Sequence, residues 1–256
     1  MDMKKTILSE KELQLLESLI SSYGYIVDFQ QIESRLEISH QSVRNLVAKL
    51  VRNGWLVRIK KGHFAIANLE SHNFSNISPL AIAQVLVPAS YVSLEYALNY
   101  HGYFDQLPAK VTSVTTSNTR RYEFQDMEYL FVKAKPGIMT GFSEITIEGQ
   151  RANVATLEKT LLDLLHFRKD SYTIDLLIEK LKETKDEISV QKMVELSKVY
   201  PITLRRRLGF LMDLSGINSD SLHKELKGTP GFAKLTKEAN LFNAKWRLYY
   251  EDRFAE

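Results

Sequence analysis

Apolar residues recur at helical spacing in three successive segments near the start of the chain. In the first segment, leucines follow every three or four residues after the capping pair Ser9 and Glu12, and Gly24 ends the pattern. Asp28 begins the second segment and Ser39 the third, and both side chains are typical of helix N-caps. The pattern therefore predicts three consecutive helices.

After the third helix the pattern changes to that of strands. Residues 55–59 and 63–67 are rich in branched and aromatic side chains, and a turn of two lysines and a glycine separates them. Trp55 is expected to close this hairpin onto the third helix. Three helices and a two-stranded hairpin make a winged helix-turn-helix, which we assign to residues 1–70 as a first domain.

The remaining chain passes from a polar segment to strand patterns and then to helices. Residues 71–79 predict a linker, and residues 80–256 predict a second domain of mixed α/β content, a small sheet plus C-terminal helices. The expected fold class is therefore α+β. Its predicted elements are helices at 79–87 and within 90–102 (beginning at Ser90 or Ser93), four or five strands within 111–154, five helices between 156 and 228, and a strand or extended arm at 241–254.

Composition narrows the class of protein. The chain has 256 residues, of which 44% are hydrophobic and 25% charged, which is enough apolar material for two cores. The absence of cysteine excludes disulfides and thiolate zinc sites, and it is compatible with a reducing compartment. The first 13 residues lack the apolar stretch of a signal peptide, and no apolar window is long enough to cross a bilayer. We expect a cytoplasmic protein without membrane contacts.

Positive charge is concentrated in the predicted third helix and hairpin. Residues 38–69 contain six lysines and arginines and no acid, so the rest of a chain with net charge +3 has more acidic than basic residues. A localised basic segment is the footprint expected of a polyanion-binding site. The alternative is a winged helix that makes protein contacts and has a solvated basic face.

Helical phase divides the third helix into two faces. Val43, Leu46, Val47, Leu50 and Val51 form one apolar stripe, and polar side chains cover the opposite face. Side chains near the start of such a helix reach base edges, whereas cations further along and on the hairpin suit phosphates. The expected base-reading residues are Gln41, Arg44 and Asn45, and the expected phosphate contacts are Ser39, Ser42, Lys49, Arg52, Arg58, Lys60, Lys61 and His63.

No spacing in the second domain indicates catalysis. The six histidines are scattered, and no phosphate-binding or nucleophile motif is present. Glu158, Lys159 and Asp163 share one helix, which allows either a nuclease-like cluster or a charge pair over a core stripe, and we favour the charge pair. His101 is most simply the C-terminus of a helix. We therefore predict no enzyme, no metal and no cofactor.

Four motifs follow the winged helix in an order and spacing that resemble one family. They are YVSLEYALNYHG at 91–102, VTSVTT at 111–116, ANVATLEKTLLDLLHF at 152–167 and LRRRLGFLMDLSG at 204–216. Together with the winged helix they resemble the AbiEi-type antitoxins and transcriptional regulators, over about residues 7–220. These proteins are the antitoxins of type IV (AbiE) toxin–antitoxin systems, which act in abortive infection and phage defence.

The resemblance implies a repressor that binds inverted repeats of double-stranded DNA in its own promoter. It also implies that the second domain antagonises a cognate nucleotidyltransferase toxin, with or without a direct complex. Arg205, Arg206 and Arg207 then suggest a charged antitoxin surface. The alternative for these arginines, which we favour, is a solvated helix face with an interdomain salt bridge. In it, at least one arginine leans toward the core edge and pairs with an acid.

A regulator of another class stays open as an alternative to the antitoxin. In this alternative the chain is a stand-alone winged-helix regulator, and its second domain binds a small-molecule or protein effector. The strands within 122–142 are rich in tyrosine and phenylalanine, which are side chains that line effector pockets. A second domain that is packed and closed in this region would count against the effector.

Overall fold

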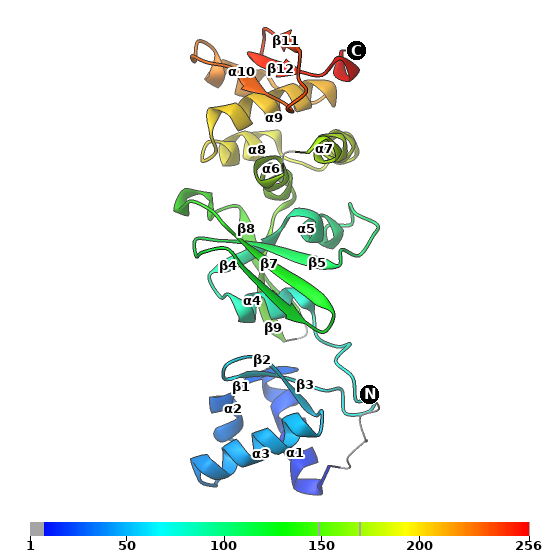
Figure 1. Ribbon diagram of the computed structural model, residues 1–256, viewed down its shortest axis with the longest axis vertical. Coiled ribbons are helices and arrows are strands. Elements are labelled where there is room, and N and C mark those ends of the chain that lie inside the picture. Colours follow the sequence, from blue (N-terminus) through cyan, green and yellow to red (C-terminus); the bar gives the residue numbers. More distant parts are fainter. Residues whose placement is uncertain (1–7, 148, 169, 256) are drawn as a thin grey trace.

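The structure, a computed structural model, describes residues 8–147, 149–168 and 170–255. Residues 1–7, which the sequence analysis placed in the first domain and compared with signal peptides, lie outside the described residues. Figure 1 shows three tiers along the long axis of the molecule: a winged helix at one end, a six-stranded sheet in the middle, and helices with a small sheet at the other end. This arrangement confirms the predicted α+β class.

The first tier is the expected winged helix, and local side-chain caps define its helices. Ser9 and Glu12 form a complete capping box, and Asp28 forms a second one with Gln31. Ser39 caps the third helix through the backbone N–H of Ser42. The elements are α1 (Glu10–Tyr23), β1 (Ile26–Asp28), α2 (Phe29–Glu33), α3 (His40–Arg52), β2 (Leu56–Lys60) and β3 (His63–Ile66).

The middle tier is a mixed sheet with the strand order β6-β7-β5-β4-β9-β8. Two neighbouring pairs, β4 with β9 and β5 with β7, are parallel, and the other neighbours are antiparallel. One helix, α4, packs on one face, and α5 lies on the other (Figure 1). The elements are α4 (Pro79–Leu86), β4 (Ser90–Ser93), α5 (Leu94–Tyr100), β5 (Lys110–Thr115), β6 (Arg120–Phe124), β7 (Met127–Lys133), η1 (Pro136–Ile138), β8 (Phe142–Ile147) and β9 (Gln150–Ala155).

The segment from Ser90 differs from the sequence-based expectation, because a strand precedes the helix. All four residues of β4 are buried, since this strand is central and pairs with both β5 and β9. The hydroxyl of Ser93 does not cap α5, because it donates to Asp163 at 2.8 Å. Leu94 makes the turn into α5 with a φ of 58°, a conformation uncommon for a branched side chain.

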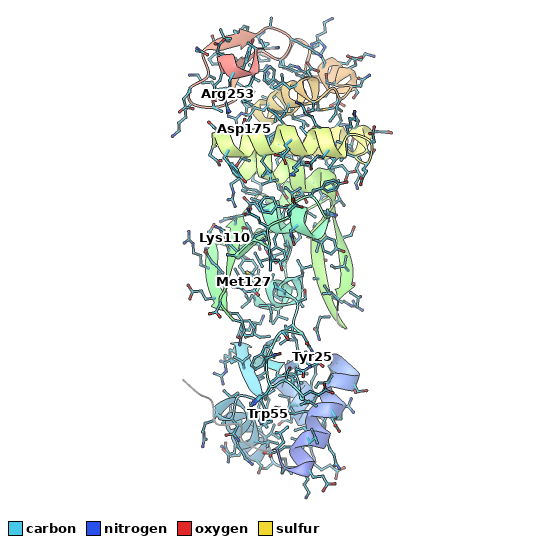
Figure 2. The ribbon with its side chains drawn as sticks, turned by 90° about the vertical axis from the view of Figure 1, so that its right-hand side faces the viewer. Tyr25, Trp55, Lys110, Met127, Asp175 and Arg253 are labelled. Carbon is cyan, nitrogen blue, oxygen red and sulfur yellow. The ribbon has the colours of Figure 1, made fainter. Side chains whose placement is uncertain are left out.

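The third tier begins at the opposite face of the sheet and ends in a small three-stranded sheet. Its C-terminal segment is fastened to α7 by Arg253, which pairs with Asp175 at 2.8 Å (Figure 2). The stretch 241–254, expected as a strand or an extended arm, supplies two of the strands. The elements are α6 (Leu157–Phe167), α7 (Ser171–Thr184), α8 (Val190–Ser197), α9 (Ile202–Leu214), α10 (Asp220–Leu226), β10 (Ala233–Lys234), β11 (Leu241–Asn243), β12 (Leu248–Tyr250) and η2 (Asp252–Phe254).

The sheet of the winged helix, β1-β3-β2, is packed on both faces. One face covers the core formed with α1 and α3. The other face carries Ile26 and Ala65 into a second core that includes α4 and the six-stranded sheet. At the start of β9, Gln150 Nε2 donates to the carbonyl oxygens of Tyr23 and Ile26, the latter at 3.1 Å. The first two tiers therefore share one continuous core.

The predicted linker, residues 71–79, is packed between these tiers. The ring of His72 stacks on the ring of Trp55, with 3.9 Å between centroids. Phe74 contacts both neighbouring cores. Ser78, which is buried, caps α4 through the backbone N–H of Leu80. Across the described ranges, no helix is long and apolar enough to cross a membrane.

Candidate nucleic-acid interface

Helix α3 has the two faces that the sequence pattern predicts. Val43, Val47 and Leu50 are buried, and Leu46 and Val51 are partly buried against the same core. The opposite face is open to solvent, because no element of the described chain covers it. Its exposed residues are Gln41, Ser42, Arg44, Asn45, Ala48, Lys49 and Arg52.

The first turn of α3 holds its polar side chains in a short ladder. The hydroxyl groups of Ser39 and Ser42 lie 2.9 Å apart, and Ser39 also accepts the backbone N–H of Ser42 at 3.2 Å. Gln41 Nε2 donates to Asn45 Oδ1 at 3.2 Å. Each of these two amides keeps unused donor and acceptor capacity, which an adenine edge requires.

Two acids from the preceding helices reach the segment that contains no acid of its own. Lys49 Nζ lies 2.8 Å from the buried carboxylate of Glu12, and this contact together with Ser9 lowers the pKa of Glu12. The ring of His40 lies 2.6 Å from Glu33. Lys49, expected to contact phosphate, is therefore partly neutralised inside the fold, although its side chain is half exposed.

Five other cations of this segment make no ion pair within the described ranges. Four of them rim a groove of about 610 Å³ between α3 and the hairpin β2–β3. The guanidinium of Arg58 lies over the ring of Phe64, with 5.6 Å to its centroid. Apolar side chains, among them Val47, Ala48 and Val51, line the rest of the groove. Cations around the rim of such a groove can contact phosphates. The five cations are Arg44, Arg52, Arg58, Lys60 and Lys61, and all but Lys60 line the groove.

The turn of the hairpin is held in place by a backbone hydrogen bond from α2. The backbone N–H of Phe29 donates to the carbonyl oxygen of Gly62 at 2.8 Å, and Gly62 has a φ of 78°. His63 pairs in register with Asp28 of β1 and is half-buried. Lys61 at the tip is exposed. The structure thus fixes the hairpin beside α3 and leaves its tip cation open.

Arg206, expected as part of a charged surface, is instead buried. Only 2% of this residue is exposed, and its Nη2 donates to the carbonyl oxygens of Thr229 and Pro230 and to the Thr229 hydroxyl at 2.9–3.0 Å. The expectation that one arginine reaches the core edge is confirmed. Its polar partners are backbone and hydroxyl oxygens rather than a carboxylate.

The neighbouring arginines are also engaged within the fold. Arg205 pairs with Glu225 of α10 and donates to the Ser197 hydroxyl at 3.2 Å. Arg207 Nε donates to the carbonyl oxygen of Lys234 at 2.6 Å. The three arginines thus fasten α9 to the elements around it. The antitoxin surface at this cluster stays a prediction, in which the buried Arg206 cannot be an exposed member.

The charge pair predicted on α6 is the centre of a closed polar network. Lys159 Nζ lies 2.6 Å from Asp163 Oδ1, and both side chains are fully buried. Asp163 also accepts from the hydroxyl groups of Tyr91, Ser93 and Tyr200 at 2.6–3.0 Å. Burial and the Asp163 charge raise the pKa of both tyrosines far above the usual range. These buried residues join the sheet to the third tier.

Other candidate chemistry in the second part of the chain is also structural. His101 ends α5, and its Nε2 donates to the Ala155 carbonyl oxygen at 2.7 Å. Tyr129 and Phe131, in the aromatic strands considered for an effector pocket, lie in the core with α4. Across the described residues, no group of three or more His, Cys, Asp or Glu is placed to hold a metal ion.

Comparison with known proteins finds a family match within the winged helix. Residues 14–67 match the family described as transcriptional regulator, AbiEi antitoxin, and this confirms the resemblance there. The whole chain is similar to the crystal structure of the RV2827C protein from Mycobacterium tuberculosis, with a TM-score of 0.67 and 14% identity over 97% of this chain and 94% of that one. At that identity the likeness shows the fold alone. None of the curated proteins matches the chain.

Proposed function

We propose that the chain is a cytoplasmic, sequence-specific repressor that binds inverted repeats of double-stranded DNA in its own promoter. The observation that carries this proposal is the set of unpaired cations around the α3–hairpin groove. They lie in the segment that matches AbiEi regulators. Exposed cations without acidic partners favour a polyanion, because binding then releases counterions without first breaking internal ion pairs.

The residues divide into two proposed roles. Gln41, Arg44 and Asn45 occupy the first turns of α3 and are proposed to read base edges, with Arg44 pairing with guanine and the amides with adenine. We expect Lys49 to contribute less to phosphate binding than the other cations, because Glu12 already pairs with it. The proposed phosphate contacts are Ser39, Ser42, Lys49, Arg52, Arg58, Lys60, Lys61 and His63.

A mobility-shift assay with the DNA upstream of the gene tests this role. At about 0.15 M salt we expect binding on the order of a thousandfold tighter than to a random duplex of the same length. The variant Tyr172→Ala, which changes an exposed ring on α7, serves as the control and keeps both affinities. Equal affinities of the parent protein for the two duplexes would contradict a sequence-specific repressor.

We further propose a division of labour in which residues 1–70 bind DNA, residues 71–79 connect, and residues 80–256 act as the antitoxin. The proposed system is a type IV toxin–antitoxin pair in abortive infection, and the antagonised toxin is a nucleotidyltransferase. The resemblance of the motifs supports this assignment. No catalytic step is assigned to the chain.

Co-expression with a nucleotidyltransferase toxin of a type IV system tests the antitoxin role. We expect the full chain to restore growth of cells that express the toxin. The double variant Arg44→Ala/Lys61→Ala should lose repression of a promoter reporter and still restore growth, because the substituted residues lie in the first tier. Growth arrest that the full chain does not relieve would contradict the antitoxin role and leave the DNA-binding role intact.

A further inference from the structure

Exposed aromatic rings form a row on the outer face of the small C-terminal sheet. Phe232 is 58% exposed and Phe242 is 50% exposed. Tyr249 lies between them, with ring centroids 5.4 Å from Phe232 and 5.0 Å from Phe242. Strand register places Phe242 on one side of Tyr249 and Lys234 on the other. Because directly paired residues share a face, these side chains occupy one surface.

The inner face of the same sheet is already filled. Ala233 and Leu248 alternate with the outward residues and are buried in the core with α9. Trp246 is also buried there, and a Cβ on Gly209 of α9 would lie 2.2 Å from its ring. The outward rings therefore do not complete this core. Contiguous exposed apolar groups of this kind mark interaction sites.

Two cations accompany the row of rings. Lys234 is exposed within it. Arg247, which precedes β12 and has a φ of 50°, is exposed as well, and its Nε donates to the carbonyl oxygen of Gly231, the neighbour of Phe232, at 2.8 Å. Neither makes an ion pair within the described ranges. Two acids follow β12: Glu251 is paired with Arg253 at 2.8 Å, and Asp252 is exposed. Rings interleaved with unpaired cations complement unpaired bases on a phosphate backbone, because the rings stack and the cations neutralise.

We propose that this face, the C-terminal platform (Phe232, Lys234, Phe242, Arg247 and Tyr249), binds single-stranded nucleic acid. Bases stack on the two most exposed rings, and phosphates lie against the two cations. A duplex keeps its base faces stacked inside and offers the rings nothing equivalent. The platform lies at the opposite end of the long axis from α3 (Figure 1), so the proposal is independent of duplex binding by the winged helix.

Fluorescence anisotropy of the full chain with labelled oligo(dT) and oligo(U), about 12 nucleotides long, tests the platform. The double variant Phe232→Ala/Phe242→Ala should bind both probes at least about tenfold more weakly. Lys234→Gln should lower the salt slope by roughly 0.7. Tyr172→Ala, which removes a ring 66% exposed on α7, is the matched control and should bind like the parent.

A second variant tests whether the winged helix contributes to the measured single-strand affinity. Arg44→Ala/Lys61→Ala should retain single-strand affinity, while the double phenylalanine variant retains duplex affinity and its urea midpoint. Preference for oligo(dT) or for oligo(U) supports the proposal and identifies DNA or RNA as the source of the strand. Unchanged affinity in the double phenylalanine variant overturns it, as does an absence of binding by the parent at about 0.05 M salt. A change in sedimentation of the free double variant also overturns it, since the face is then an interface between copies.

Discussion

Helices α3 and α9 are each 13 residues long and carry three cations each, yet they use them in opposite ways. On α3, Arg44 and Arg52 are exposed and have no acidic partner among the described residues. On α9, Arg206 is buried and its Nη2 donates to oxygens of the chain itself. The comparison teaches that pairing and exposure, rather than the number of cations, distinguish a binding surface from a structural brace.

The different surroundings of the two helices explain the contrast. Helix α9 is covered by α10 and by the strand β10. Backbone carbonyl oxygens in this region accept hydrogen bonds, and an arginine side chain can donate several of them at once. Helix α3 is covered on one face only. A cation left in water costs little, whereas a buried one must be fully hydrogen-bonded. The predictions below test this contrast, from the largest expected effect to the smallest.

Removing the buried arginine should cost the most. Arg206→Ala leaves three oxygens without their donor and opens a cavity, so we expect the free energy of unfolding to fall by about 3–5 kcal/mol. Urea denaturation measures this change, with Tyr172→Ala as the exposed control. A loss below about 1 kcal/mol would show that Arg206 contributes no more to stability than an exposed cation does, which would contradict the contrast between the helices.

Removing an exposed arginine of α3 should affect binding instead of folding. Arg44→Ala should cost about 1–3 kcal/mol in affinity for the promoter repeats and less for random duplex, because a base contact is lost. Its urea midpoint should stay unchanged. Titration of both duplexes gives the two differences, and equal losses on both would show that Arg44 contacts only the backbone.

The pair between Glu12 and Lys49 predicts a pH dependence of stability. The Lys49 ammonium, with Ser9, holds the pKa of Glu12 below its ordinary value of 4.5, so the charged carboxylate stabilises the fold at neutral pH. That contribution is lost as pH falls through the lowered pKa. Glu12→Gln should therefore be about 1 kcal/mol less stable at pH 7 and lose less on acidification. Parallel urea midpoints of the variant and the parent from neutral to acid pH would contradict this.

The smallest effect separates two lysines of the expected phosphate set. Lys61→Ala should reduce the salt slope of duplex binding by about one, since Lys61 is exposed and unpaired. Lys49→Ala should reduce it less, because Glu12 already neutralises part of that charge. The slopes come from binding constants measured at several salt concentrations. Equal reductions would show that Lys49 leaves Glu12 when DNA binds.

Local signals in the sequence were enough to predict the winged helix. The caps at Ser9, Asp28 and Ser39 act within three residues, and the stripe on α3 follows from helical spacing alone. Strand β4 was missed because its residues read equally well as the start of a helix. Its identity comes from pairing with β5 and β9, which lie far away in sequence.

Long-range contacts account for what the sequence left hidden in the candidate site. The segment 38–69 contains no acid, but folding brings Glu12 to Lys49. The spacing of Lys159 and Asp163 predicted a pair, whereas Tyr91 and Tyr200 reach it only through the tertiary fold. Arg206 shows the same limit, since no nearby position indicates that Thr229 and Pro230 supply its acceptors.

The core shared by the first two tiers has a geometric consequence for any array of bound copies. Ile26 and Ala65 pack in one core with α4, and Gln150 is hydrogen-bonded across the junction. These contacts fix the orientation of the winged helix relative to the six-stranded sheet. The rest of each copy bound to DNA would then project from the duplex in a fixed direction, which is set by the helical position of its repeat. B-DNA turns once in about 10.5 base pairs, so inserting half a turn between two repeats would place neighbouring copies on opposite sides of the duplex.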